Sequence, residues 1–293
     1  MKNLKKLKKI LPAFKVNMGG IILDQALPQK DVDMIDPFLL VHHLEHKFDL
    51  NTQQSRAGVP PHPHRGFAPV SFVFKGGVHH RDSNDVSSVV YPGGTQWMHA
   101  GKGIVHSERP AKEVAEAGES WELIQFWVNA PAAHKMSDSK YVGLQKDNTP
   151  TTYISDGNVE VGVVAGRFQD LNGPIDTFTP IMALRLNFSE TGEVEIPVPP
   201  SFNGFVYLLD GALTYNDSTK LKAKDLAWLA NEGEIVKLRA TENTRAILLA
   251  GEPIGEPVAT YGPFVMNEQS EVMQAMRDYQ VGKMGRLEEV FDK

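Results

Sequence analysis

Two histidines, His62 and His64, stand two residues apart in the stretch HPHRGF. In a β-strand, residues two apart point to the same face, so both imidazoles can face the interior of a barrel. A second pair with the same spacing, His106 and Glu108, follows in IVHSERP. Three imidazoles and one carboxylate suit a divalent first-row metal and leave coordination positions for water, substrate or oxygen. The two pairs therefore predict a metal site.

The histidines are confined to one part of the chain. All 10 lie at or before His134, so a site built from histidine belongs to the first half of the 293 residues. The alternative is that these three histidines are ordinary hydrogen-bonded side chains. Glu108 would then form a salt bridge with Arg109 or Lys102.

Short apolar runs separated by turns must position these pairs. The chain has 25 Gly and 19 Pro, many of them between such runs, and this favours an all-β architecture. Strands are expected in the first half at 69–74, 77–83, 84–94, 102–110 and 121–131. In the second half they are expected at 159–168, 181–188, 192–199, 204–215, 226–230, 234–240 and 245–251. Apolar residues at helical spacing predict one helix over 267–283, with Asn267 or Ser270 as its N-cap.

The two halves share a local pattern. SFVFKGGVHH (71–80) and VYLLDGALTY (206–215) each contain a strand, a glycine turn and a return strand, which indicates an internal duplication of a small β-barrel. The polar, turn-rich stretch 132–158 is the expected interdomain connection. We therefore expect a metal-binding N-terminal barrel over 1–135. A C-terminal barrel without metal, ending in the helix, is expected over 136–293.

Composition narrows the classes of partner. The formal net charge of -6 gives no electrostatic footprint for direct binding of nucleic acid. Cysteine is absent, so disulfides are excluded and the reducing cytoplasm is the expected compartment. No apolar run reaches the roughly 18 residues that a membrane-spanning helix needs, and we expect no membrane association. The basic stretch MKNLKKLKKILPAF is expected to be a solvated arm, with membrane-surface or anionic-partner contact as the alternative.

Several motifs resemble those of the pirin family. They are HPHRGF (62–67), HRDS (80–83), PGGTQWMHAGKGIVHSE (92–108), IQFWVNAP (124–131) and GPFVMNEQSEVMQAMRDYQVGKMG (262–285). Pirins are bicupins, with two tandem cupin barrels (double-stranded β-helix or jelly-roll) and a metal in the N-terminal one. The resemblance implies an all-β fold of two such barrels with a C-terminal helix. It also implies that His62, His64, His106 and Glu108 are the metal ligands.

The resemblance further implies an activity. Several pirins resemble quercetin 2,3-dioxygenase, so this chain is expected to use one divalent metal and O2 on a small, flavonol-like aromatic substrate. Fe(II) is the expected metal, and Mn, Ni, Co, Cu or Zn would also suit the ligands. Glu108 is the candidate catalytic base for the flavonol hydroxyl. The alternative is a non-enzymatic, metal- and redox-dependent regulator that binds transcription factors or metabolic enzymes, and a third hypothesis is a small-molecule binder without catalysis.

Two positions depart from the family pattern. Relatives usually read GFETV where this chain has Ala68 and Pro69 after Phe67, so substrate access or a contact beside the metal is expected to differ there. His99 stands where relatives often have Thr. It is expected to be an ordinary polar loop residue, with a proton relay as the alternative.

A few further residues carry expectations of their own. Gln125, inside an apolar strand, is expected either beside the metal ligands or bonded to backbone. Only one of the adjacent His79 and His80 can face inward, and a structural role is expected. Arg81 and Asp82 are expected to form a local ion pair. Five aromatic residues and one methionine are expected mostly in the core, with some lining an apolar pocket around the metal (Phe72, Phe74, Trp97, Met98, Phe126 and Trp127).

Overall fold

The chain folds into two compact units. The computed structural model describes residues 3–291, and strands dominate it as predicted. Residues 41–148 and 255–293 form one unit, here called the first barrel, and residues 1–40 and 149–254 form the other, the second barrel. The sequence-based bounds are 1–135 and 136–293. The compact units differ from them because residues 1–40 group with the later unit and residues 255–293 with the earlier one.

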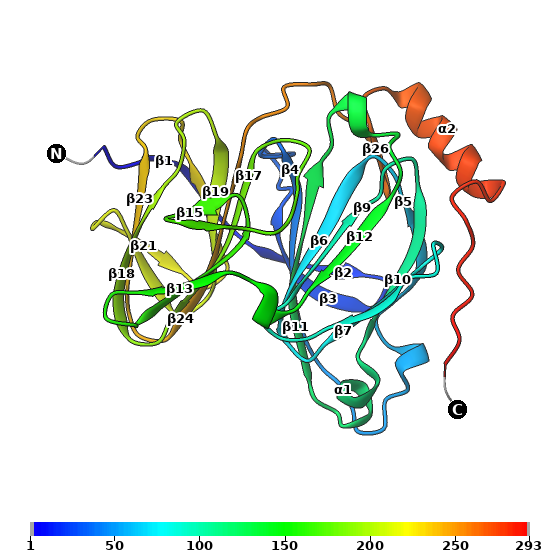
Figure 1. Ribbon diagram of the computed structural model, residues 1–293, viewed down its shortest axis with the longest axis horizontal. Coiled ribbons are helices and arrows are strands. Elements are labelled where there is room, and N and C mark those ends of the chain that lie inside the picture. Colours follow the sequence, from blue (N-terminus) through cyan, green and yellow to red (C-terminus); the bar gives the residue numbers. More distant parts are fainter. Residues whose placement is uncertain (1–2, 292–293) are drawn as a thin grey trace. The chain divides into compact units, whose positions relative to one another are not determined.

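The first barrel consists of two antiparallel sheets that face each other (Figure 1). Its larger sheet contains, in order, β12 (Lys140–Leu144), β9 (Thr95–His99), β6 (Phe67–Lys75), β11 (Ser120–Asn129) and β4 (Phe38–Lys47). Its smaller sheet has the order β5 (Val59–His64), β10 (Ile104–Pro110), β7 (Val78–Asp82) and β8 (Ser87–Val90). Both predicted ligand pairs therefore lie on neighbouring strands of the smaller sheet.

The second barrel repeats this plan. Its larger sheet has the order β1 (Leu7–Pro12), β22 (Asp225–Leu229), β19 (Asn203–Asp210), β24 (Thr244–Gly251), β17 (Ile181–Phe188), β14 (Val159–Ala165) and β13 (Thr151–Ile154). Its smaller sheet has the order β18 (Thr191–Pro197), β23 (Ile235–Thr241), β20 (Ala212–Tyr215) and β21 (Thr219–Lys222). The order β9-β6-β11-β4 corresponds to β22-β19-β24-β17, and β5-β10-β7-β8 corresponds to β18-β23-β20-β21. This shared order is what an internal duplication produces.

The predicted return strands are present, but they do not pair with the strands before them. Strand β6 belongs to the larger sheet and β7 to the smaller one, and the same holds for β19 and β20. Gly76 and Gly211, with φ of 72° and 76°, occupy the turns in between. A positive φ is open to glycine without strain, so the chain can leave one sheet and enter the other within a short turn.

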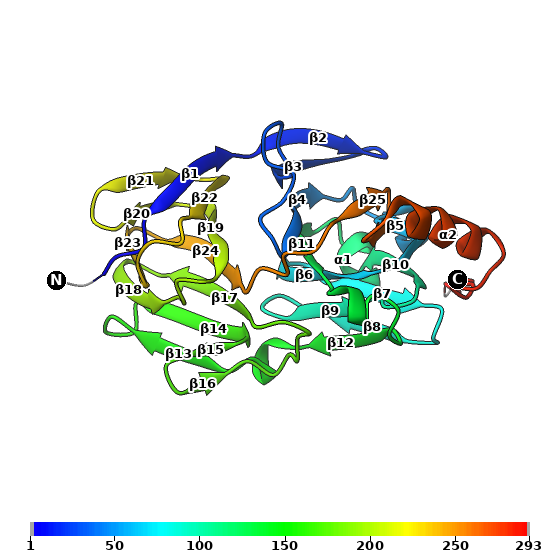
Figure 2. The same cartoon turned by 90° about the horizontal axis from the view of Figure 1, so that it is seen from above.

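The expectation of a solvated N-terminal arm is wrong. Strand β1 pairs with β22 at the edge of the second barrel (Figure 2), and Leu11 is buried. Lys5 is buried as well, and its ammonium group donates to the carbonyls of Pro199 and Gly233. This segment is therefore an edge strand of the second barrel and not a solvated arm.

The stretch 132–158 is more regular than expected. It contains strand β12, which pairs with β9 in the first barrel, and strand β13, which pairs with β14 in the second. The boundary between the two compact units falls inside this stretch, at residues 148 and 149.

The predicted C-terminal helix is α2 (Gln269–Gln280), and it belongs to the first barrel. Its N-cap is Glu268, not Asn267 or Ser270. Glu268 and Glu271 form a capping box, in which each side chain accepts a backbone N–H of the other residue. This reciprocal arrangement satisfies two N–H groups at the start of the helix, where they lack helical partners.

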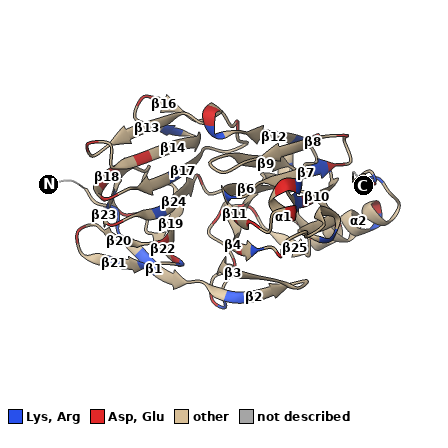
Figure 3. Cartoon of the chain, turned by 90° about the horizontal axis from the view of Figure 1, so that it is seen from below, with Lys and Arg blue, Asp and Glu red and all other residues tan. Residues whose placement is uncertain are grey.

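The remaining elements are short. In the first barrel they are α1 (Lys112–Glu116), η1 (Gln54–Arg56), η2 (Ala132–His134), η3 (Lys146–Asn148), β25 (Ala259–Tyr261) and β26 (Phe264–Met266). In the second they are β15 (Arg167–Phe168) and β16 (Leu171–Asn172). Strands β3 (Ile21–Leu27) and β2 (Phe14–Met18), although within residues 1–40, follow β4 as the last two strands of the seven-stranded sheet that begins with β12. Acidic and basic residues are interspersed along the elements of both barrels (Figure 3). Within residues 3–291, no helix combines the length and apolar character needed to cross a membrane.

Candidate metal centre

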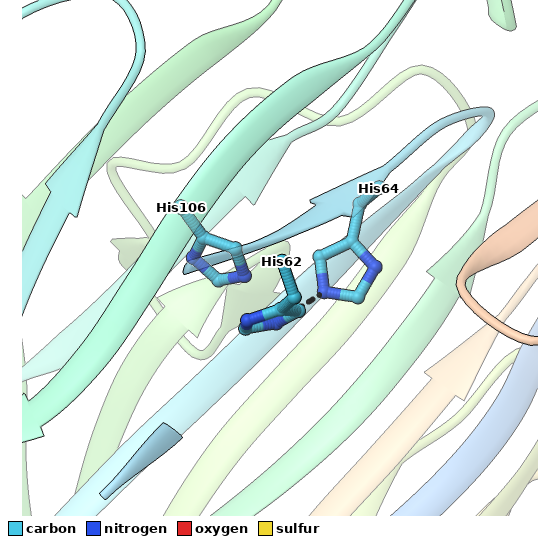
Figure 4. Close-up of side chains that lie close together, drawn as sticks. All are labelled: His62, His64 and His106. Atoms are coloured by element: carbon cyan, nitrogen blue, oxygen red, sulfur yellow. Dashed lines mark hydrogen bonds between the residues drawn. The ribbon is translucent and has the colours of Figure 1, made fainter. Parts of the chain in front are cut away.

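Three of the four predicted ligands converge. His62 and His64 lie on β5, His106 lies on the neighbouring β10, and one ring nitrogen from each lies within 4.8 Å of the others. The register of the two strands sets His62 directly opposite His106. Figure 4 shows the three rings pointing toward one another. His64 and His106 are buried, and His62 is half-buried.

The two ring nitrogens of each histidine have different surroundings. In His62, Nδ1 lies 2.8 Å from the carbonyl oxygen of Pro60, and in His64, Nδ1 lies 3.4 Å from that of Pro263. A carbonyl only accepts, so Nδ1 carries the proton in both rings and Nε2 carries a lone pair. In His106, Nε2 is buried and has no hydrogen-bond partner. The free nitrogens of all three rings therefore face one common point.

This arrangement is unsatisfied without a ligand. Nε2 of His62 and Nε2 of His64 lie 3.1 Å apart, the contact marked by the dashed line in Figure 4. When both rings are neutral and carry their proton on Nδ1, two lone pairs face each other there and no proton bridges them. A buried polar atom without a partner costs free energy. A cation bound by Nε2 of all three rings would remove this cost, so the three histidines fit a metal ion.

Burial also keeps two of these rings in the form that binds metal. Removal from water holds the pKa of His64 and of His106 well below the usual value of 6.5, and the neighbouring His62 lowers each further. Both imidazoles are therefore neutral near pH 7, which is the form that coordinates a metal.

Glu108 lies near the histidines but is not one of the converging group. Its Oε1 accepts from Ser71 Oγ at 3.3 Å and from the Nε2 of Gln96, and its Oε2 accepts from Gln125 Nε2 at 2.8 Å. These donors lie on β6, β9 and β11 of the facing sheet. The carboxylate is therefore held by three donors across the barrel interior, and Gln125 lies beside a predicted ligand, as one of its two expected roles required.

The C-terminal segment braces the end of β5. Arg65, which follows His64, is buried and donates to the carbonyl of Lys102 at 2.6 Å and to the carboxylate of Asp278 on α2 at 3.0 Å. The buried ammonium of Lys135 donates to the carbonyls of Gly66 and Val265, and burial lowers its pKa to about 8. These contacts explain why residues 255–293 belong to the first barrel.

Aromatic rings border the histidines on one side. Trp127 lies with its ring centroid 5.5 Å from that of His64 and 4.3 Å from that of Phe67. The first family departure, Ala68 and Pro69, is close by, since Pro69 pairs with Trp127 across the β6–β11 ladder and Ala68 precedes it. Both are buried, so their effect on substrate access stays a prediction.

Three expectations about nearby residues change. Glu108 pairs with neither Arg109 nor Lys102, because those two contact Glu289 and Asp138 respectively. His99 lies on strand β9 and not in a loop, and it is outside the converging group. Asp82 contacts His80, while Arg81 donates to Gln54 and approaches Glu289, so they do not form the expected ion pair.

His80 is the inward-facing member of its pair, and it contacts the site. Its Nδ1 lies 3.3 Å from Nδ1 of His106, and its Nε2 lies 2.8 Å from Oδ2 of Asp82. His79 points the other way, toward Gln54 and Ser87. The sequence contained a signal for this contact, because His80 and Asp82 have the same i, i+2 spacing as the ligand pairs.

A second group in the first barrel could also approach a cation. His43, Glu45 and Glu122 each offer an atom within 4.8 Å of the others. Glu122 is already neutralised, however, because Lys75 Nζ lies 2.8 Å and His43 Nε2 lies 3.3 Å from its carboxylate oxygens. An ammonium group at that distance would repel a cation, so this group is an internal ion-pair network.

Comparison with known proteins agrees with the architecture of two barrels. A family model described as "Pirin" matches residues 20–128, and one described as "Pirin C-terminal cupin domain" matches residues 183–285. The fold and the converging histidines define a bicupin. A relative from Arabidopsis thaliana, "Pirin-like protein 2", is 33% identical over 95% of this chain and 85% of its own length. The chain belongs to the pirin family.

Other relatives carry the name of an enzyme. A "putative quercetin 2,3-dioxygenase" of Pseudomonas aeruginosa is 33% identical over 86% of this chain and 87% of its own length. A crystal structure described as quercetin 2,3-dioxygenase from Acinetobacter baumannii has a TM-score of 0.90 and 33% identity, covering 96% of this chain and 99% of that one. A bacterial pirin from Escherichia coli, solved in complex with nickel(II), has a TM-score of 0.65 at 16% identity, covering 84% of this chain and 99% of that one, and shows the fold alone.

Proposed function

We propose that the first barrel binds one divalent transition metal through His62, His64 and His106. The observation that supports this most directly is the 3.1 Å contact between two Nε2 atoms whose rings both donate from Nδ1. Glu108 is proposed as the fourth ligand, reaching the metal by a change of side-chain rotamer that releases one of its three donors. Fe(II) is the proposed metal, with Mn, Ni, Co, Cu and Zn as competitors.

We further propose that the protein is a dioxygenase of the quercetin 2,3-dioxygenase type, acting in the cytoplasm. Relatives with that name cover most of the chain, and this favours an enzyme over the alternative, a metal-dependent regulator with a protein partner. A bound metal would act as a Lewis acid that lowers the pKa of a flavonol hydroxyl. Trp127, which is half-buried, offers an aromatic ring beside His64 for a flat, aromatic substrate, and the buried Phe67 packs against that ring.

Glu108 is proposed as the group that accepts the proton of the flavonol hydroxyl. Its Oε2 is held by Gln125, which is half-buried, whereas its Oε1 is held by the buried Ser71 and Gln96. The Oε2 side therefore gives substrate the more accessible route. In this role Gln125 and Ser71 orient the carboxylate, and exchange of one hydrogen bond frees it to accept a proton.

The test is aerobic turnover of quercetin by protein loaded in turn with Fe, Mn, Ni, Co or Cu. Consumption of O2 and release of carbon monoxide are expected with at least one metal, and not under nitrogen. His62→Ala is expected to lose metal and turnover together. The matched control is His134→Ala, an exposed histidine outside the converging group, which should keep both. Absence of turnover with all five metals would refute the dioxygenase, and equal metal content in the His62→Ala variant would refute the site.

A further inference from the structure

We propose that His80 and Asp82 position His106 by fixing which of its ring nitrogens carries the proton. The inference rests on the metal site proposed above. Both residues lie on β7, next to β10, and both are buried. The contacts run from His106 Nδ1 to His80 Nδ1, 3.3 Å, and from His80 Nε2 to Asp82 Oδ2, 2.8 Å. They form a continuous chain that ends at a carboxylate.

The order of protons along this chain follows from its end. An ionised carboxylate can only accept, so His80 donates from Nε2 to Asp82. A neutral His80 then has a lone pair on Nδ1 and accepts from His106. His106 consequently carries its proton on Nδ1, and its Nε2, the buried atom without a partner, keeps its lone pair for the metal. Asp82 therefore dictates which nitrogen of His106 is free.

The carboxylate itself is held firmly. Its other oxygen, Oδ1, accepts the backbone N–H groups of Asn84 at 2.8 Å and of Val86 at 3.3 Å. The ring of Tyr141 stacks on that of His80, with a centroid distance of 3.9 Å and an interplanar angle of 9°. Neither member of the pair can turn without breaking these contacts, so the chain is rigid before metal arrives.

His106 differs in this respect from the two other histidines. The Nδ1 atoms of His62 and His64 face backbone carbonyls, whose chemistry no side-chain substitution changes. His106 alone of the three is supported by side chains. The strand order does not require a polar chain here, because β20, the strand of the second barrel that corresponds to β7, has Leu213 and Tyr215 at its buried positions. We therefore attribute the polar residues His80 and Asp82 to control of the proton position on the His106 ring.

The first test needs no metal. In metal-free protein labelled with 15N-histidine, long-range NMR correlations report which ring nitrogen carries hydrogen. The Nε2–H form is expected for His80 and the Nδ1–H form for His106, with His80→Asn and His106→Ala used for assignment. Finding His80 in the Nδ1–H form, or His106 in the Nε2–H form, would overturn the proposal.

The second test measures metal affinity with Co2+, whose visible spectrum reports its coordination. Loss of such an outer partner typically weakens metal binding about 10- to 100-fold, and this is expected for Asp82→Asn and His80→Leu. In Asp82→Asn the new amide donates toward His80. Two N–H groups then face each other, either between residue 82 and His80 or between His80 and His106. His80→Asn places an acceptor oxygen near the position of Nδ1, and it should recover most of the affinity lost in His80→Leu.

The matched control is His79→Leu, on the same strand but facing away, which should leave the Co2+ affinity unchanged. Thermal midpoints of the metal-free variants separate positioning from folding. If the affinity losses simply follow the midpoints and His80→Asn recovers nothing, the positioning role is wrong. If wild type binds Co2+, His62→Ala does not, and Asp82→Asn and His80→Leu both bind it normally, only this inference fails. If wild type itself does not bind Co2+, the metal site and this inference fail together.

Discussion

The two barrels share one strand order but fill their interiors differently. On the smaller sheet of the first barrel, the inward face carries the histidines, Glu108, His80 and Asp82. On the corresponding strands of the second barrel, the buried core residues are apolar side chains and one tyrosine (Val194, Ile196, Leu213, Tyr215, Leu221, Val236, Leu238 and Ala240). The same scaffold thus supports a polar site in one copy and a continuous hydrophobic core in the other.

This difference shows what the duplication leaves free to vary. Strand order and sheet crossing are set by backbone hydrogen bonds and by glycine turns, and both copies keep these. The inward side chains of the smaller sheet are not needed to define the fold, because either polar or apolar sets are compatible with it. The site in the first barrel therefore replaces part of an apolar core, and the second barrel shows an apolar filling of the same sheet.

The largest effects are expected from alanine substitution of one buried residue in each barrel, Leu238 in the second and His106 in the first. Leu238→Ala removes a fully buried side chain from the second barrel and should lower the free energy of unfolding by about 2 to 5 kcal/mol. His106→Ala should lower metal affinity more than the roughly 100-fold expected of an outer partner, because a ligand itself is lost. Its effect on metal-free stability should be smaller than that of Leu238→Ala, since the imidazole leaves one nitrogen unpaired.

Denaturant unfolding of the metal-free proteins, together with Co2+ titration, measures both quantities. The contrast between the barrels would be contradicted if His106→Ala destabilised the metal-free protein as strongly as Leu238→Ala.

Metal should stabilise one barrel and not the other. At a free metal concentration of about 100 times Kd, binding to the native state adds about 2.7 kcal/mol. Hydrogen exchange should therefore slow in β5 and β10 and stay unchanged in β18 and β23. Equal slowing in all four strands would mean that metal acts on the whole protein, and a chelator should reverse the effect in either case.

Acid should also distinguish the barrels. Burial lowers the pKa of His42, on β4, from 6.5 to about 4. The unfolded state therefore binds a proton before the native state does as the pH falls. Stability from this group is complete above pH 6.5 and is lost progressively between pH 6.5 and 4, with a slope of at most about 1.4 kcal/mol per pH unit.

Hydrogen exchange of metal-free protein at pH 7, 6 and 5, corrected for intrinsic rates, should show this loss in β4, β6 and β11. The second barrel contains no histidine, so β17, β19 and β24 provide the internal control. In His42→Asn the pH dependence of the first barrel should become shallower. An equal response of both barrels would show that titration elsewhere dominates.

Much of the first barrel could be predicted from sequence because its signals are local. Period-two spacing placed His62 with His64, and His106 with Glu108, on single faces of strands, and the glycine turns marked the duplication. The contacts of Glu108 could not be predicted this way, because Ser71, Gln96 and Gln125 come from three strands of the opposite sheet. The prediction for Lys5 failed for another reason. Its charge predicts exposure, but two backbone carbonyls accept hydrogen bonds from its buried ammonium group.

The smallest effect concerns the ion pair that joins the C-terminal helix to the end of β5. Arg65 and Asp278 are both nearly buried, whereas the corresponding kind of pair in the second barrel, Arg245 with Asp210, is more exposed. Asp278→Asn weakens a charge-assisted hydrogen bond and should cost about 1 to 2 kcal/mol, compared with less than about 1 kcal/mol for Asp210→Asn.

Because Arg65 directly follows His64, the loss in Asp278→Asn should appear both in α2 and at the end of β5. Hydrogen exchange of α2 and Co2+ affinity measure the two ends, and a reduction of a few-fold in affinity is expected at most, since an outer partner in direct contact with a ligand contributes more. Unchanged hydrogen exchange in α2, or an equal effect of Asp210→Asn on Co2+ affinity, would contradict the claim that α2 supports the end of β5. A faster-exchanging helix with weaker metal binding would show that the polar interior depends on this terminal segment for the rigidity that the apolar interior obtains from packing alone.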